Sequence, residues 1–160
     1  MGVYRISRNL EASLIDYIKE ELISASWNNV STEKSFAKIY DISLPSICVR
    51  LSDTTHDHAE VGTDATIRTP LIILDIFAKD DGGRLDIKDF LVSILKSGCP
   101  YYEYTITNGA IQSKVQNGNI RVINITDTVV NLGIDKADLD VHDRYRHNLA
   151  LSVSLGRVEA

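Results

Sequence analysis

The clearest pattern of hydrophobic and polar positions lies between Ile67 and Gly98, and it predicts a strand, a turn and a helix. A run of about ten residues rich in isoleucine and leucine comes first, and its flanks, with Pro70 near the start, favour a strand. The acidic and glycine-rich stretch Asp80–Gly83 then ends the strand and offers N-capping groups. The apolar residues that follow recur at helical spacing and form one stripe: Ile87, Phe90, Leu91, Ile94 and Leu95.

The two faces of this predicted strand differ in composition. Its even-numbered residues are all apolar and suit a face covered by the helix: Ile72, Leu74, Ile76 and Ala78. Its odd-numbered residues combine large apolar side chains with two charges: Leu71, Ile73, Asp75, Phe77 and Lys79. One face of an antiparallel sheet commonly meets water, so a second face this apolar needs a cover. That cover is either a second helix of the same chain or a neighbouring subunit.

The remaining chain divides into one helix, several strands and two polar segments. A helix is predicted over Asn9–Ser24, where apolar residues recur every four positions. The acidic stretches Asp53–Asp64 and Asn131–Asp143 are predicted to be long loops, which are usually functional or disordered. Extended or alternating patterns predict six further strands: Lys34–Tyr40, Ser46–Ser52, Tyr101–Thr107, Ala110–Gln116, Asn119–Val130 and Arg144–Val158.

Two Asn-Gly dipeptides, Asn108-Gly109 and Asn117-Gly118, separate three of these strands. Asn-Gly between alternating residues is the strongest short-range signal for a hairpin, so the three strands should form a meander. The predicted fold class is therefore α/β in the broad sense (α+β), with a mixed, mainly antiparallel sheet flanked by two helices. With 160 residues, 44% of them hydrophobic, the chain is expected to form a single domain over residues 1–160.

Charge and cysteine content exclude some classes of partner. A formal net charge of −5 argues against a general attraction to nucleic acid or to an anionic membrane. No apolar segment approaches the ~20 residues that span a bilayer, and the N-terminus lacks the apolar region of a signal peptide. Cys48 and Cys99 are therefore expected to be free thiols in a reducing cytosol.

One cluster could carry metal chemistry. His56-Asp57-His58, with Glu60 close by, offers imidazole and carboxylate ligands, which supports a small metal-dependent hydrolase as one alternative. The spacing matches no defined metal motif, and a solvated loop explains the same residues. The sequence also lacks the glycine-rich, nucleophile-elbow and zinc-protease motifs. We therefore expect no catalytic residue, no metal and no cofactor.

Charges separate along the last third of the chain. Asp127–Asp143 holds five aspartates and one lysine, whereas Arg144–Val158 holds three arginines and no acid. Such separation is usually a solvated surface, but it also suits head-to-tail contacts between identical subunits. The predicted oligomer interface combines the second face of the long strand with these flanks: Leu71, Ile73, Asp75, Phe77, Asp138, Asp140, Arg144 and Arg146.

The chain resembles a known family in the order of its elements and in two segments, Asp80–Leu95 (DDGGRLDIKDFLVSIL) and Asp143–Leu155 (DRYRHNLALSVSL). The chain resembles the tail terminator and neck proteins of long-tailed bacteriophages, which are small α/β proteins that form rings at the head–tail joint. The resemblance implies a homohexameric ring that caps the tail tube, stops its polymerisation and presents a surface to the head connector. No cofactor or reaction is implied.

The resemblance also implies partners and a location. The partners would be the tail tube protein and a head connector or completion protein, and the protein would assemble in the host bacterial cytoplasm and reside in the virion. Residues His56, Asp57, His58 and Glu60, in the predicted loop, would contact these partners. A head-completion or adaptor protein of the same neck is the alternative within this class.

Overall fold

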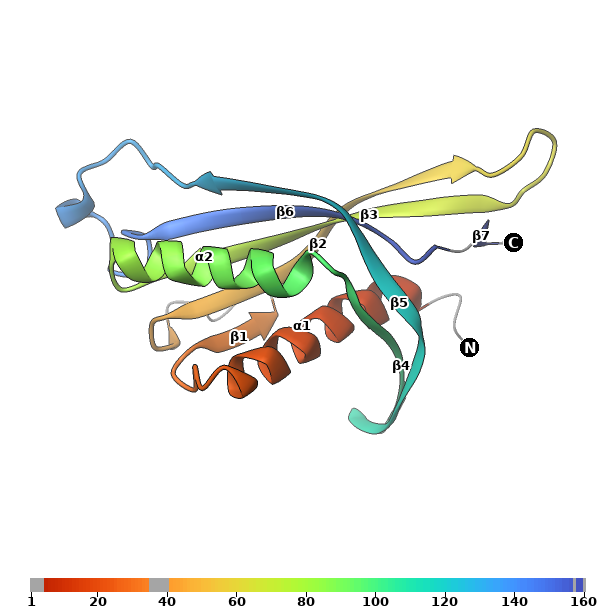
Figure 1. Cartoon of the computed structure of the whole chain (residues 1–160), viewed down its shortest axis with the longest axis horizontal. Helices are drawn as coiled ribbons and strands as arrows, with labels where there is room; N and C mark the ends of the chain where they lie inside the picture. Colours follow the sequence, from red (N-terminus) through yellow and green to blue (C-terminus); the bar gives the residue numbers. More distant parts are fainter. Residues whose placement is uncertain (1–4, 35–40, 157, 160) are drawn as a thin grey trace.

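The computed structural model describes residues 5–34, 41–156 and 158–159 (Figure 1). Its elements, in chain order, are α1 (Ile6–Ser24), β1 (Ser31–Lys34), β2 (Ser46–His58), β3 (Thr66–Phe77), α2 (Asp81–Leu95), β4 (Cys99–Thr107), β5 (Ala110–Val129), the short 3-10 helix η3 (Lys136–Asp138), β6 (Arg146–Ser154) and β7 (Val158–Glu159). The predicted fold class is confirmed. The strands follow the order β1-β2-β3-β6-β5-β4, β7 pairs with β3, and the β1–β2 pair is parallel while the others are antiparallel.

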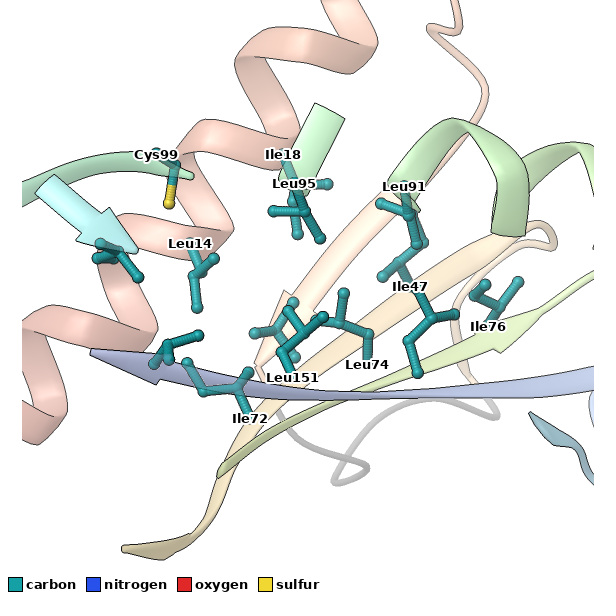
Figure 2. Packing of buried hydrophobic residues seen from close by; sticks show 14 of the residues in the cluster. Leu14, Ile18, Ile47, Ile72, Leu74, Ile76, Leu91, Leu95, Cys99 and Leu151 are labelled. Carbon is teal, nitrogen blue, oxygen red and sulfur yellow. The ribbon is translucent and has the colours of Figure 1, made fainter. Parts of the chain in front are cut away.

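Both helices lie on the same face of the sheet (Figure 1). Figure 2 shows why: Leu14 of α1 and Leu91 of α2 point into the layer that also holds Ile47, Ile72 and Leu151 of the strands. All five side chains are fully buried. The even-numbered residues of β3 thus face the helices, as predicted. A second helix on the opposite face, one of the two predicted covers, is wrong, because α1 packs beside α2 in the same core.

The caps of α2 explain its limits. The Asp80 side chain accepts a hydrogen bond from the Gly83 amide (2.6 Å), which satisfies one of the free donors of the first turn. After the last turn, Gly98 has φ +82°, and a Cβ there would lie 2.5 Å from the Ile120 carbonyl oxygen. Only glycine fits this reversal into β4. Of the predicted stripe, Ile87, Leu91 and Leu95 are buried, while Phe90 and Ile94 are half-buried.

The predicted loop Asp53–Asp64 is wrong over half its length. Strand β2 continues to His58 and pairs with β3 out to Thr66, so that only Ala59–Ala65 forms the turn. This hairpin projects beyond the helices (Figure 1), and we call residues 52–70 the arm. The arm lies outside the core that the two described helices cover, although Arg68 donates to Ser7 of α1 (2.9 Å), so its strands need no apolar positions at every second residue. The signal used to recognise strands is therefore missing there.

The predicted meander is also wrong. Asn108-Gly109 forms the expected tight turn, with φ values of +52° and +79°, between β4 and β5. Asn117-Gly118, however, lies inside β5, where Gln116 pairs with Tyr102 and Asn119 with Pro100. The extra residue makes a β-bulge, and Gly118 (φ +106°) accommodates it. Beyond the bulge, β5 leaves β4 and pairs with β6 from Arg121 onward.

The bounds of α1 and β6 differ from the predicted ones. Helix α1 begins at Ile6, three residues before the predicted start, and ends at Ser24 as predicted. The final strand is shorter than predicted and covers Arg146–Ser154. The predicted strand Lys34–Tyr40 lies outside the described residues except for Lys34, which ends β1.

Candidate assembly surface

The side of the sheet opposite the helices is the first candidate surface, and we call it the second face. At its centre, Leu71 and Ile73 of β3 lie beside Ser152 and Ala150 of β6. All four are half-buried in the isolated chain. The small side chains of β6 keep this part of the face flat. A flat, partly apolar sheet face with neither helix on it suits packing against another protein surface.

Toward one end of the second face, Asp75 is 2% exposed and holds a polar network. Its carboxylate accepts a hydrogen bond from the Asn148 side chain (3.1 Å) and forms ion pairs with Arg50 (3.5 Å) and Arg146 (3.8 Å). The Arg146 guanidinium also lies over the Phe77 ring, 4.8 Å from its centroid. A buried carboxylate is tolerated only when it is paired in this way.

This network corrects part of the predicted interface. Asp75 and Phe77 are buried within their own chain, at 2% and 1% exposure, so neither can line a surface between subunits in this conformation. Arg146 is held by Asp75 and by Asp143 (3.4 Å) in the same chain. Leu71 and Ile73 remain available at the second face, and their contact with another subunit stays a prediction.

The acidic and basic flanks meet within one chain, in the segment that follows β5. Arg144 donates from Nε to the Leu139 carbonyl (3.2 Å), whereas Asp138 lies exposed at the end of η3. Asp140 accepts hydrogen bonds from the backbone amide (3.0 Å) and the ring of His142 (2.8 Å). Of the predicted interface residues in this segment, Arg144 and Asp140 are thus engaged within residues 131–145, whereas Asp138 is exposed.

His142 links residues 131–145 to the segment that contains Ile42. Its Nε2 lies 2.9 Å from the Ile42 carbonyl oxygen, and its Nδ1 lies 2.8 Å from an Asp140 carboxylate oxygen. Both ring nitrogens face acceptors, so only the imidazolium form can donate to both. Burial lowers the pKa of His142, but the hydrogen bonds to Ile42 and Asp140 outweigh it and raise the pKa above its ordinary value. The backbone amide and ring of His142 in turn lower the pKa of Asp140.

His147 is arranged in the opposite way. Its Nδ1 lies 2.7 Å from Arg84 Nη1, and a guanidinium can only donate, so Nδ1 must accept. Nε2 then carries the hydrogen and donates to Asp127 (3.0 Å). Arg84 is also paired with Asp81 (2.9 Å). These contacts join the start of α2 to β5 and β6 through the buried His147, while Asp81 and Asp127 are exposed. No local pattern predicts this arrangement, because the four residues come from three separate segments.

The predicted partner-contact residues lie on the arm. His56 and His58 are exposed on β2, opposite Arg68 and Thr66 of β3, and Asp57 and Glu60 are exposed beside them. Within the part of the chain that the structure describes, no group of three or more His, Cys, Asp and Glu side chains could hold a metal ion. The arrangement of the two histidines therefore gives the metal-dependent hydrolase no support.

Both cysteines are buried and free. Burial and the nearby Asp75 carboxylate raise the pKa of the Cys48 thiol to about 11, and burial raises that of Cys99 to about 12. Neither thiol is therefore activated as a nucleophile. Among the described helices, none has the length and apolar character needed to cross a membrane.

Comparison with known proteins adds no assignment to these observations. No protein-family model matches the sequence, and no curated protein matches it either.

Proposed function

We propose that the chain is a structural assembly protein of the tail-terminator kind, which forms a ring of identical subunits on the end of a phage tail tube. The observation that carries the proposal is the second face, where Leu71 and Ile73 remain half-buried and neither helix lies. The resemblance of Asp80–Leu95 and Asp143–Leu155 to tail terminator and neck proteins supplies the kind of assembly.

The arm supports the same proposal. Residues 53 and 55–58 of β2 are exposed, and this part of the hairpin extends beyond the helices (Figure 1). The arm is a narrow ribbon of β2 and β3, joined at Thr66 and Ile67 by the short β7, and it lies outside the helix-covered core, so contact with a partner would stabilise it. A closed ring requires each subunit to present different surfaces to its two neighbours, and a partly apolar sheet face and a projecting arm are two such different surfaces.

In this role the ring would stop growth of the tube on one side and bind the head connector on the other. The partners are then copies of this chain, the tail tube protein and a connector or head-completion protein, and the protein resides in the virion. A label on the chain in assembled particles separates a position at the tube end from one on the head side.

Negative-stain imaging and sedimentation of the purified chain test the proposal. We expect rings, and we expect Ile73→Asp on the second face to abolish them while the circular dichroism spectrum is unchanged. Leu85→Asp is the matched control, because Leu85 is 41% exposed on the outer side of α2, away from the second face. A chain that stays monomeric at every concentration reached would overturn the proposal.

A further inference from the structure

A groove lies between α1 and the β4–β5 hairpin. Apolar residues from both sides line it, among them Ile15 of α1 and Ile106 and Ile111 of the hairpin. Its volume is about 250 Å³, smaller than the roughly 300–1,000 Å³ of typical small-molecule sites. Ile111 is 62% exposed, so the groove presents apolar surface to solvent. Its size suits one or two apolar side chains of another protein.

The rim of this groove carries positive charge. Arg8 and Lys34 both line it; Arg8 is exposed, and the Lys34 side chain is 65% exposed. Among the described residues that line the groove, the acid is Glu11, which is 14% exposed and already engaged: one oxygen lies 3.5 Å from Lys34 Nζ and the other accepts from the Leu51 amide (3.0 Å). The two cations and one acid leave the groove with a net positive charge.

The tip of the arm has complementary properties. Val61 stands at its apex with a relative exposure of 104%, and Glu60 and Asp64 flank it, both exposed. The tip therefore offers one apolar side chain between two carboxylates. It cannot enter the groove of its own chain, because the arm projects away from α1 and the β4–β5 hairpin (Figure 1).

We infer that the arm tip of one copy docks in the groove of the next copy, with Val61 against the apolar walls and Glu60 and Asp64 beside Arg8 and Lys34. This inference rests on the proposed assembly of identical subunits and names a contact within it. The contact is heterologous, since the two surfaces differ, and repetition of such a contact closes a ring or extends a filament. Opposite charges at the rim fix the register and reject wrong pairings.

Charge reversal on each side tests the contact. Glu60→Lys with Asp64→Lys should weaken self-association at least about tenfold, because like charges then meet at the rim. Arg8→Glu with Lys34→Glu should weaken it similarly. Asp86→Lys and Lys96→Glu, at exposed positions of α2 and at its C-cap, are the matched controls and should assemble as the unaltered chain does.

Mixing the two reversed chains is the decisive experiment. Each reversed tip then meets an oppositely charged groove, so the mixture should recover assembly that neither chain shows alone. In parallel, chains carrying Val61→Cys and Ile15→Cys should form an intermolecular disulfide when mixed, since both native cysteines are buried. A chain with Val61→Cys alone controls for tip-to-tip disulfides.

The outcomes separate this contact from the proposed function. If the unaltered chain forms rings but both reversed chains assemble equally well and no disulfide forms, the docking contact is overturned and the ring stands. If the unaltered chain is monomeric at every concentration, both fall together. Recovery in the mixture with the expected disulfide establishes the contact.

Discussion

The two faces of strand β3 make the most instructive comparison in this molecule. On the helix side, Ile72, Leu74 and Ile76 are each 0% exposed and packed under α1 and α2. On the other side, Leu71 and Ile73 are only half-buried, in the same strand and one residue away. Side chains of similar size and polarity thus reach complete burial on one face and not on the other.

The difference lies in what each face contacts. The helix side is closed by apolar side chains from two helices and five strands, which removes its surface from water within the monomer. Among the described residues, the second face is closed at one end, by Cys48, Phe77 and Leu44 with the Asp75 network beside them. Composition alone therefore does not reveal whether an apolar face is covered by its own chain or left for a partner.

The largest expected effect is in the helix-covered core. Leu91→Ala should reduce the free energy of unfolding by about 2–5 kcal/mol, because Leu91 is fully buried and the truncation leaves a cavity. Ile73→Ala on the second face is the matched comparison and should cost clearly less in the monomer. Chemical denaturation of both variants measures the difference. Equal losses would mean that the second face is packed as tightly as the core.

The next effect concerns the polar end of the second face. Asp75→Ala should destabilise the chain by about 1–3 kcal/mol, because Asn148, Arg50 and Arg146 lose their shared acceptor. Asp75→Asn keeps an acceptor but removes the charge, so it should fall between the unaltered chain and Asp75→Ala. Denaturation curves with no change for Asp75→Ala would show that the network is not needed for folding.

The sequence was sufficient where local pattern and local chemistry agree. Helix α2 has both a clear apolar stripe and an N-capping Asp80, and its existence and its start followed from these two signals. The even-numbered side of β3 was assigned correctly for the same reason. The tight turn at Asn108-Gly109 also followed from local backbone preference.

The sequence was insufficient where the outcome depends on neighbours distant in the chain. Asn117-Gly118 has the same local preference as Asn108-Gly109, but pairing with Pro100 and Tyr102 on β4 turns it into a bulge. The burial of Asp75 depends on Asn148, which lies 73 residues away and reaches it only through the β3–β6 pairing. In each case, the partner strand decided the structure.

A smaller effect is expected in the reactivity of the two cysteines, which lie on different sides of the sheet. Cys48 packs with Phe77 and Leu44 on the second face, whereas Cys99 belongs to the core under the helices. Both thiols should react slowly at neutral pH because their pKa values are raised, to about 11 and about 12. We expect Cys48 to label first, because its pKa is the lower of the two and more of the reactive thiolate is therefore present at neutral pH. Mass spectrometry of partly labelled protein gives the order, and earlier labelling of Cys99 would contradict the comparison.

The smallest effect is a dependence of stability on pH that arises at His142. This residue links residues 131–145 to Ile42 through its hydrogen bonds to Asp140 and to the Ile42 carbonyl. Its pKa is raised above 6.5 in the folded chain by Ile42 and Asp140, with a further contribution from the charge of Asp143. A raised pKa means that the folded state holds the proton more tightly than the unfolded state. The stabilisation is therefore fully present below pH 6.5 and is lost as the pH rises through the folded value.

His142→Gln isolates this effect, because a glutamine amide does not titrate and cannot donate in both directions. The unaltered chain should lose stability relative to this variant as the pH rises above 6.5. The Asp140 pKa is lowered below 3.8, so its contribution is present above that pH and leaves the same interval undisturbed. Denaturation curves over a pH series measure the difference in slope between the two proteins. Parallel slopes would show that His142 does not link the two segments through its proton.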